Sequence, residues 1–147
     1  MKKTYIFATA TFLAATAALA HSGVKNSAVK ARMDAMSAVG AEMKTLGLMS
    51  KGASAFNADT AKAAATAIAT QASNTPDLFE ANEDDPKSEA KPAIWENFQD
   101  FTAKAIALEK VARDLSMSIE NFDDLAPAMS ALGETCKACH GDYRQKK

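Results

Sequence analysis

The chain has 147 residues, of which 48% are hydrophobic and 24% charged, and its formal net charge is −1. A near balance of charges without a basic stripe argues against a nucleic-acid-binding protein. Beyond the N-terminal segment, no stretch is long and apolar enough to cross a bilayer.

Residues 1–20 have the order of a secretory signal peptide. Lys2 and Lys3 precede an apolar stretch that ends in the small-residue sequence Ala18-Leu19-Ala20, so we expect cleavage before His21. The alternative is an uncleaved membrane anchor, but the apolar stretch is shorter than the roughly 20 residues of a spanning helix. Residues 21–147, a chain of 127 residues with a formal charge of −3, would then form one domain in the bacterial periplasm.

The first two elements expected in this domain are helices over residues 23–48 and 58–73. Two overlapping stripes of period 3.5 run along the first helix. One stripe is Val29, Met33, Met36, Gly40, Met43 and Gly47, and the other is Arg32, Met36, Val39, Met43 and Leu46. The second helix is rich in alanine, and Asn57 or Asp59 is expected to cap its start.

The composition changes over residues 74–91, where Pro76, Pro86 and an acidic run at 83–85 predict an exposed connection. The third helix is expected over residues 92–116, with Pro92 at its first position. The fourth is expected over residues 124–146. Four amphipathic helices with such loops predict an all-α fold, an antiparallel four-helix bundle.

The sequence Cys136-Lys137-Ala138-Cys139-His140 is the attachment pattern of a c-type haem. On a helix with about 100° per residue, Cys136, Cys139 and His140 lie within an arc of about 100° and can reach one haem together. A secreted destination agrees, because haem is attached outside the cytoplasm. The pattern therefore predicts one haem c per chain, bound covalently through Cys136 and Cys139, with His140 as an axial iron ligand.

Three other kinds of site share this cysteine spacing. A thioredoxin-like redox pair would begin a helix after a strand, whereas this pair lies near the end of a late helix. A structural disulfide would close a very small loop and stabilise little. A zinc site would lack a fourth ligand, because His21 is the only other histidine. Haem is favoured over all three.

A second iron ligand must come from upstream, because only seven residues follow the motif. A methionine thioether suits haem iron and raises its reduction potential, but methionine at helical spacing is usually flexible core filler. The residues alone leave six candidates open, which are Met33, Met36, Met43, Met49, Met117 and Met129.

Over essentially all of residues 21–147 the chain resembles class II cytochromes c, the cytochrome c′ family. The resemblance rests on the four-helix pattern, on the haem motif followed by Tyr143-Arg144 near the C-terminus, on an Arg-x-x-x-Met pair in the first helix, and on Pro-Ala-Ile-Trp at the start of the third. Low-spin members of that family place a methionine four residues after an arginine, whereas five-coordinate members place an apolar residue there and bind gases.

The resemblance thus implies a low-spin haem with Met36, rather than Met33 or Met43, as the distal axial ligand. It also implies that Arg32 lies near the haem propionates and that Arg144 lies beside the proximal His140. Gly141 makes the backbone beside that histidine looser than a usual helix interior.

The function predicted from these features is single-electron transfer by a monohaem cytochrome, with periplasmic redox proteins as partners. No enzymatic activity, catalytic residue, nucleic-acid partner or membrane span of the mature chain is expected. One alternative is a five-coordinate haem protein that binds nitric oxide or carbon monoxide, and another is a helical binding module without haem. The sequence leaves the oligomeric state open, a homodimer included.

Overall fold

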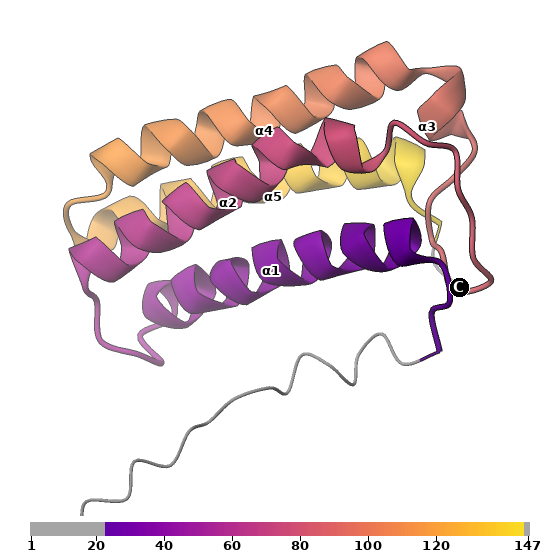
Figure 1. Cartoon of the computed structure of the whole chain (residues 1–147). Helices are drawn as coiled ribbons and strands as arrows, with labels where there is room; N and C mark the ends of the chain where they lie inside the picture. Colours follow the sequence, from indigo (N-terminus) through magenta and orange to yellow (C-terminus); the bar gives the residue numbers. More distant parts are fainter. Residues whose placement is uncertain (1–22, 146–147) are drawn as a thin grey trace, which may run out of the picture.

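The computed structural model describes residues 23–145, which form an antiparallel four-helix bundle (Figure 1). The helices in chain order are α1 (Ser27–Ser50), α2 (Ala58–Leu78), the short α3 (Ala93–Glu96), α4 (Phe98–Ser118), the 3₁₀ turn η2 (Phe122–Asp124) and α5 (Leu125–Tyr143). Successive long helices run in opposite directions, so the start of α1 and the end of α5 lie at the same end of the bundle as α3. The expected all-α bundle is confirmed. The expected signal peptide and its cleavage site lie outside the described residues.

The first two long helices begin at asparagine caps. The side chain of Asn26 accepts a hydrogen bond from the backbone N–H of Val29, and that of Asn57 accepts one from Thr60. Each bond satisfies an N–H group that the first helical turn leaves without a partner. Of the two caps expected for α2, Asn57 takes the role, and Asp59 lies in the first turn.

The second helix is longer than expected, because it continues through Pro76 to Leu78 instead of ending near Ser73. Proline lacks a backbone N–H and usually breaks a helix interior. Here it lies in the last turn, where its own carbonyl accepts a hydrogen bond from Phe79 at 3.0 Å. The connection to α3 therefore covers residues 79–92 and not 74–91.

The expected third helix is divided at Asn97, whose φ of −130° and ψ of 45° are not helical. Asparagine is a poor residue for a helix interior because its side chain competes for backbone hydrogen bonds. Pro92 precedes α3 as its N-cap residue instead of filling its first position. The expectation of one continuous helix over residues 92–116 was wrong at this point.

Two hydrophobic clusters hold the bundle. The larger one joins all four long helices towards the η2 end and includes Leu46, Ile68 and Leu132. The smaller one lies at the end of α5 and has Phe79, Ile94, Phe101 and Tyr143 as its buried members. We call this second group the aromatic cluster. It packs against the part of α5 that carries the cysteines.

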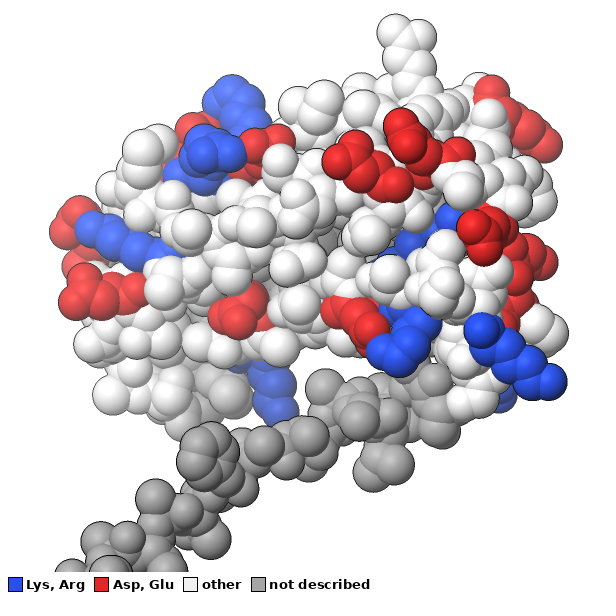
Figure 2. All heavy atoms as spheres, in the orientation of Figure 1, with Lys and Arg blue, Asp and Glu red and all other residues white. Residues whose placement is uncertain are grey.

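The face of the bundle drawn in Figure 2 is largely uncharged, with charged side chains in small groups, some of mixed sign and some acidic only. Within residues 23–145, no helix is long and apolar enough to span a membrane.

Candidate functional site

The last turns of α5 bring Cys136, Cys139 and His140 to one side of the helix. Both cysteines are free thiols and are half-buried, and His140 is exposed. Cys139 packs against the aromatic cluster, so one side of the motif rests on a rigid apolar base. Two thiols and an adjacent imidazole on an apolar helix face form a donor set that fits haem c.

Burial raises the pKa of both thiols. The pKa of Cys139 rises to about 11, chiefly because the side chain is desolvated, and that of Cys136 rises for the same reason. A redox-active pair of the thioredoxin type needs a lowered thiol pKa. The structure therefore speaks against that alternative. Among residues 23–145, no group of three or more histidine, cysteine and acidic side chains is placed to hold a metal such as zinc.

Iron ligation by a histidine requires a neutral imidazole, and the surroundings of His140 favour that form. Although the residue is exposed overall, partial desolvation lowers its pKa, and the Arg144 cation lowers it further, while Glu89 acts in the opposite direction. Arg144 itself donates from Nε to Glu89 Oε2 at 2.6 Å. The structure thus places Arg144 within electrostatic reach of His140.

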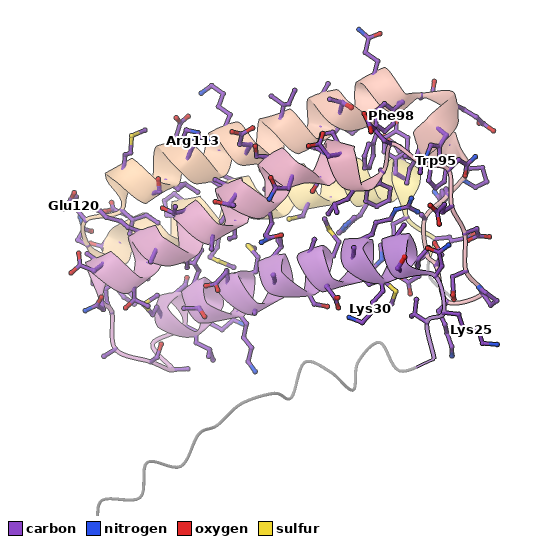
Figure 3. The ribbon with its side chains drawn as sticks, viewed as in Figure 1. Lys25, Lys30, Trp95, Phe98, Arg113 and Glu120 are labelled. Carbon is purple, nitrogen blue, oxygen red and sulfur yellow. The ribbon has the colours of Figure 1, made fainter. Side chains whose placement is uncertain are left out.

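The aromatic cluster is built from rings in close contact. The Phe101 centroid lies 4.9 Å from that of Phe79 and 5.5 Å from that of Tyr143, which it meets edge-on. The ring centroids of Trp95 and Phe79 are 6.4 Å apart, and the Trp95 indole N–H donates to the Phe79 carbonyl at 2.8 Å. Figure 3 shows Trp95 and Phe98 together at this end of the bundle.

A polar network that the sequence did not reveal closes the same end. The Tyr143 hydroxyl donates to Asp100 Oδ2 at 2.6 Å, and Lys104 Nζ lies 3.3 Å from carboxylate oxygens of both Asp100 and Asp142. The hydrogen bond to Asp100 and burial raise the pKa of Tyr143 to about 12. The network joins the start of α4 to the end of α5 across about 40 residues of sequence, so no local spacing could have predicted it.

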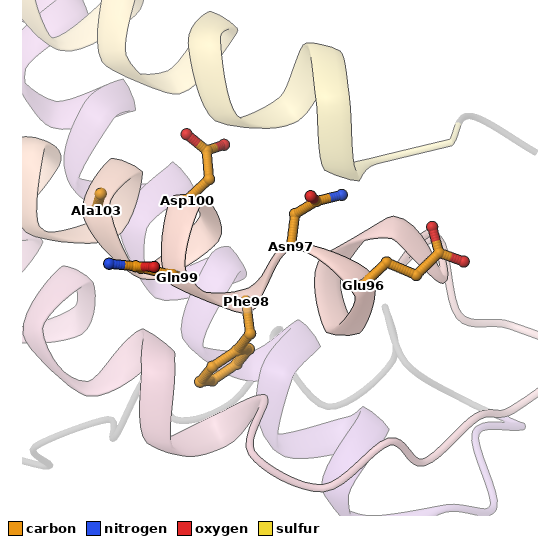
Figure 4. Close-up of a pocket in the computed structure, with 6 residues that line it drawn as sticks. All are labelled: Glu96, Asn97, Phe98, Gln99, Asp100 and Ala103. Carbon is orange, nitrogen blue, oxygen red and sulfur yellow. The ribbon is translucent and has the colours of Figure 1, made fainter.

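An open, partly polar depression lies beside this network at the junction of α3 and α4 (Figure 4). It is lined by Glu96, Asn97, Phe98, Gln99, Asp100 and Ala103. In the close-up, Asn97 and Asp100 point towards α5, whereas Phe98 points away from it. None of the six lining residues belongs to the haem motif.

The first helix presents methionine at the edge of its buried face. Met36 is half-buried and, at 100° per residue, lies between buried Val29 and buried Arg32 around the helix. Met33 lies further round, beside exposed Gly40. Of the two stripes expected for α1, the one that contains Arg32, Val39 and Leu46 therefore describes the buried face better.

The other four methionines have different surroundings. Met49 is a buried member of the larger cluster, and Met43 and Met129 pack against it. Met117 is 67% exposed near the end of α4. This leaves Met33 and Met36 in the half of α1 that lies at the same end of the bundle as the cysteines.

Arg32 is only 3% exposed, and its guanidinium lies over two aromatic rings. The Arg32 Cζ atom is 4.7 Å from the Phe79 ring centroid and 5.3 Å from that of Trp95. Three of its five N–H groups donate to backbone carbonyls, those of Leu78, Ala81 and Glu83. A propionate contact of Arg32 stays a prediction, and it would have to use the remaining N–H groups.

Comparison with known proteins identifies the family of the chain. Residues 27–144 match the family model described as Cytochrome C'. A cytochrome c-556 from Agrobacterium tumefaciens (strain B2A) is 42% identical over 81% of this chain and 98% of the relative, and a cytochrome c′ from Cereibacter sphaeroides is 36% identical over 94% and 96%.

Solved structures give the same result. The structure of cytochrome c′ from Rhodopseudomonas palustris superposes with a TM-score of 0.77 at 26% identity, covering 84% of this chain and 99% of the other. A structural model of oxidised R. palustris cytochrome c556 gives a TM-score of 0.76 at 25% identity, with 82% and 98% covered. The matches cover nearly the whole described length of the chain, including its C-x-x-C-H motif. The chain therefore belongs to the cytochrome c′ family and takes haem c as its cofactor.

Proposed function

We propose that this chain is a periplasmic electron carrier whose low-spin haem iron is held by His140 and Met36. Family membership supports a monohaem electron carrier, and the named relatives include both cytochromes c-556 and cytochromes c′. The finer assignment rests on one observation, the position of Met36 beside Val29 and Arg32 at the edge of the buried face of α1.

The residues of the chain divide the work in a simple way. When bound, haem iron supplies one-electron oxidation and reduction. Cys136 and Cys139 would hold the group covalently, and His140 would donate a ring nitrogen to it. Met36 supplies a soft thioether, which favours the reduced iron and raises the reduction potential. Held by these four side chains, the group would need little rearrangement of the chain to gain or lose an electron.

The five-coordinate, gas-binding state is the second candidate. One solved relative is the nitric oxide complex of a cytochrome c′ mutant from Alcaligenes xylosoxidans, which superposes with a TM-score of 0.71 at 27% identity. The two candidates differ in what occupies the distal side of the iron. Export to the periplasm, a redox-protein partner and the lack of enzymatic activity belong to the proposal, whereas a non-haem module does not agree with the family.

The test replaces the two remaining methionines one at a time in purified haem-loaded protein. Met36→Ala should convert the iron to the high-spin form, lower the reduction potential and allow rapid binding of carbon monoxide. Met33→Ala is the matched control, because it removes the same kind of side chain from a half-buried position further round α1, beside exposed Gly40, and it should leave the spectrum unchanged. A high-spin spectrum for Met33→Ala but not for Met36→Ala would move the ligand to Met33.

A further inference from the structure

The connection between α2 and α3 contacts both helices that carry the proposed iron ligands. We call this connection, residues 79–92, the strap. In Figure 1 it passes from the end of α2 around the end of the bundle at which α1 begins and α5 ends. Its contacts with each helix are made by different residues.

On the α1 side, the anchor is the Asp85 carboxylate, which is only 5% exposed. Asp85 Oδ2 accepts from the backbone N–H of Lys25 at 2.8 Å and of Asn26 at 3.1 Å. Asp85 Oδ1 accepts from the N–H of Lys87 at 2.9 Å, so both oxygens are held. Asn26 also donates from Nδ2 to Glu83 Oε2 at 2.7 Å, which ties the cap residue of α1 to the strap.

Arg32 adds a second attachment nearly two turns further along α1. Its Nε and Nη1 atoms donate to the carbonyls of Leu78 and Glu83 at 2.8 and 2.7 Å, and Nη2 donates to that of Ala81. Burial lowers the pKa of Arg32, and the charge of Glu83 opposes this. Arg32 precedes Met36 by one helical turn, so its position and that of Met36 are coupled through the helix.

On the α5 side, the strap pairs with the residues that follow His140. Ala90 and Arg144 form an antiparallel bridge. The N–H of Gln145 donates to the Glu89 carbonyl at 2.8 Å, and that of Lys91 donates to the Tyr143 carbonyl at 3.0 Å. The ion pair between Glu89 and Arg144 reinforces this pairing.

Only three residues separate the two anchors, Asp85 and Glu89, and they are held in a turn. The N–H of Ser88 donates to the Asp85 carbonyl at 2.8 Å, and Ser88 Oγ accepts from the N–H of Ala90 at 3.2 Å. Ser88 is 4% exposed. This short, hydrogen-bonded segment connects the attachment to α1 with the attachment to α5.

The two halves of α1 are held in different ways. Val39, Leu46 and Met49 of its later part belong to the larger hydrophobic cluster. The buried members of the aromatic cluster come from the strap, α3, α4 and α5, and Arg32 reaches it from α1 through ring contacts. The contacts of the strap are therefore made with the part of α1 that carries Met36.

From this arrangement we infer that Asp85 is a positioning residue for the distal side of the haem. Through the strap it fixes the spacing between the start of α1 and the end of α5, and so the strength of the bond from Met36 to the iron. The inference rests on the proposed ligand role of Met36 and names the part of the chain that regulates it. Groups that hold a metal ligand directly commonly change metal affinity or activity by about 10- to 100-fold, and Asp85 acts one step further out, through the strap.

The test compares Asp85→Ala with Asp84→Ala in haem-loaded protein. Asp84 is the exposed neighbour on the same strap, so the control removes the same charge and keeps the anchor. In Asp85→Ala, ferrous protein should bind carbon monoxide about tenfold faster, the lower end of the range for groups that hold a metal ligand. The reduction potential should also fall, and backbone amides of residues 29–36 should exchange hydrogen faster. Asp84→Ala should match the wild type in all three measurements.

Asp85→Asn keeps the shape of the side chain and serves if the alanine variant does not fold. A second variant inserts two glycines between Lys87 and Ser88, which lengthens the segment between the anchors, and its control places the same insertion between Ser54 and Ala55 in the exposed α1–α2 loop. The inference would be overturned if the Asp85 and strap-insertion variants bound carbon monoxide and exchanged backbone hydrogen at wild-type rates while Met36→Ala bound carbon monoxide fast. The proposed function would then still stand. A wild-type rate in Met36→Ala would instead refute the ligand assignment and the inference with it.

Discussion

Replacing Phe101 by alanine tests whether the aromatic cluster fixes the end of α5 that carries the haem motif. The Phe101 side chain is 3% exposed and lies between the rings of Phe79 and Tyr143, at 4.9 and 5.5 Å between centroids. Removing a buried phenylalanine costs about 3–5 kcal/mol, because transfer energy is lost and a cavity remains. We expect the free energy of unfolding to fall by about 4 kcal/mol.

Urea unfolding of the haem-loaded protein, followed by circular dichroism, measures this change. With a slope of about 1.5 kcal/mol per M, the midpoint should fall by roughly 2–3 M. Phe122→Ala is the control, because Phe122 is 48% exposed in η2 at the opposite end of the bundle. The control should change stability by no more than about 0.5 kcal/mol. If the free energy of unfolding of Phe101→Ala stays within about 1 kcal/mol of that of the control, the aromatic cluster does not stabilise the end of α5.

Three further predictions concern single groups. Cys136→Ser or Cys139→Ser should weaken retention of haem in acidified organic solvent, and the double variant should abolish it, as measured by mass spectrometry; full retention in the double variant would exclude thioether bonds. Tyr143 is the only tyrosine of residues 21–147, so an ultraviolet titration should show its ionisation near pH 12, and Asp100→Asn should shift this midpoint down. Because the pKa of Tyr143 is raised in the folded protein, its contribution to stability should be lost as the pH rises from about 10 to about 12. Asp124 has a lowered pKa because it accepts two backbone N–H bonds, from residues 120 and 121. Its contribution to the free energy of unfolding should be present above its ordinary pKa of 3.8 and be lost as the pH falls through the lowered pKa. Asp124→Asn should therefore flatten the acid side of a curve of stability against pH.

Helix periodicity predicted the bundle because each long helix buries one continuous face. The errors fell at Pro76, where the helix continues through a residue that usually ends it, and at Asn97, where the helix is interrupted. Pro76 stays helical because only the last turn of α2 has to tolerate it. Ile94, Phe98 and Phe101 keep a spacing of four and three across Asn97, so the hydrophobic pattern alone could not show the break.

The haem motif was predictable because covalent attachment and iron ligation need three side chains within one helical turn. The surroundings of the motif were not predictable. Asp85 is 60 residues from Lys25 in sequence, and Glu89 is 55 residues from Arg144. Such pairs depend on how the strap returns across the end of the bundle, which leaves no periodic trace in the sequence. The sequence placed Arg32 on the first helix, one turn before Met36. It could not show that Arg32 donates to three carbonyls about 50 residues away in the sequence.

The spin state of the wild-type iron tests the central claim most directly. Haem-loaded protein in its oxidised form is examined by absorption and electron paramagnetic resonance, and the reduced form is then mixed with carbon monoxide. Ligation by His140 and Met36 predicts a low-spin spectrum with a methionine-to-iron charge-transfer band, and slow binding of carbon monoxide limited by release of Met36. A high-spin spectrum together with immediate binding of carbon monoxide would contradict the account and favour the five-coordinate, gas-binding protein.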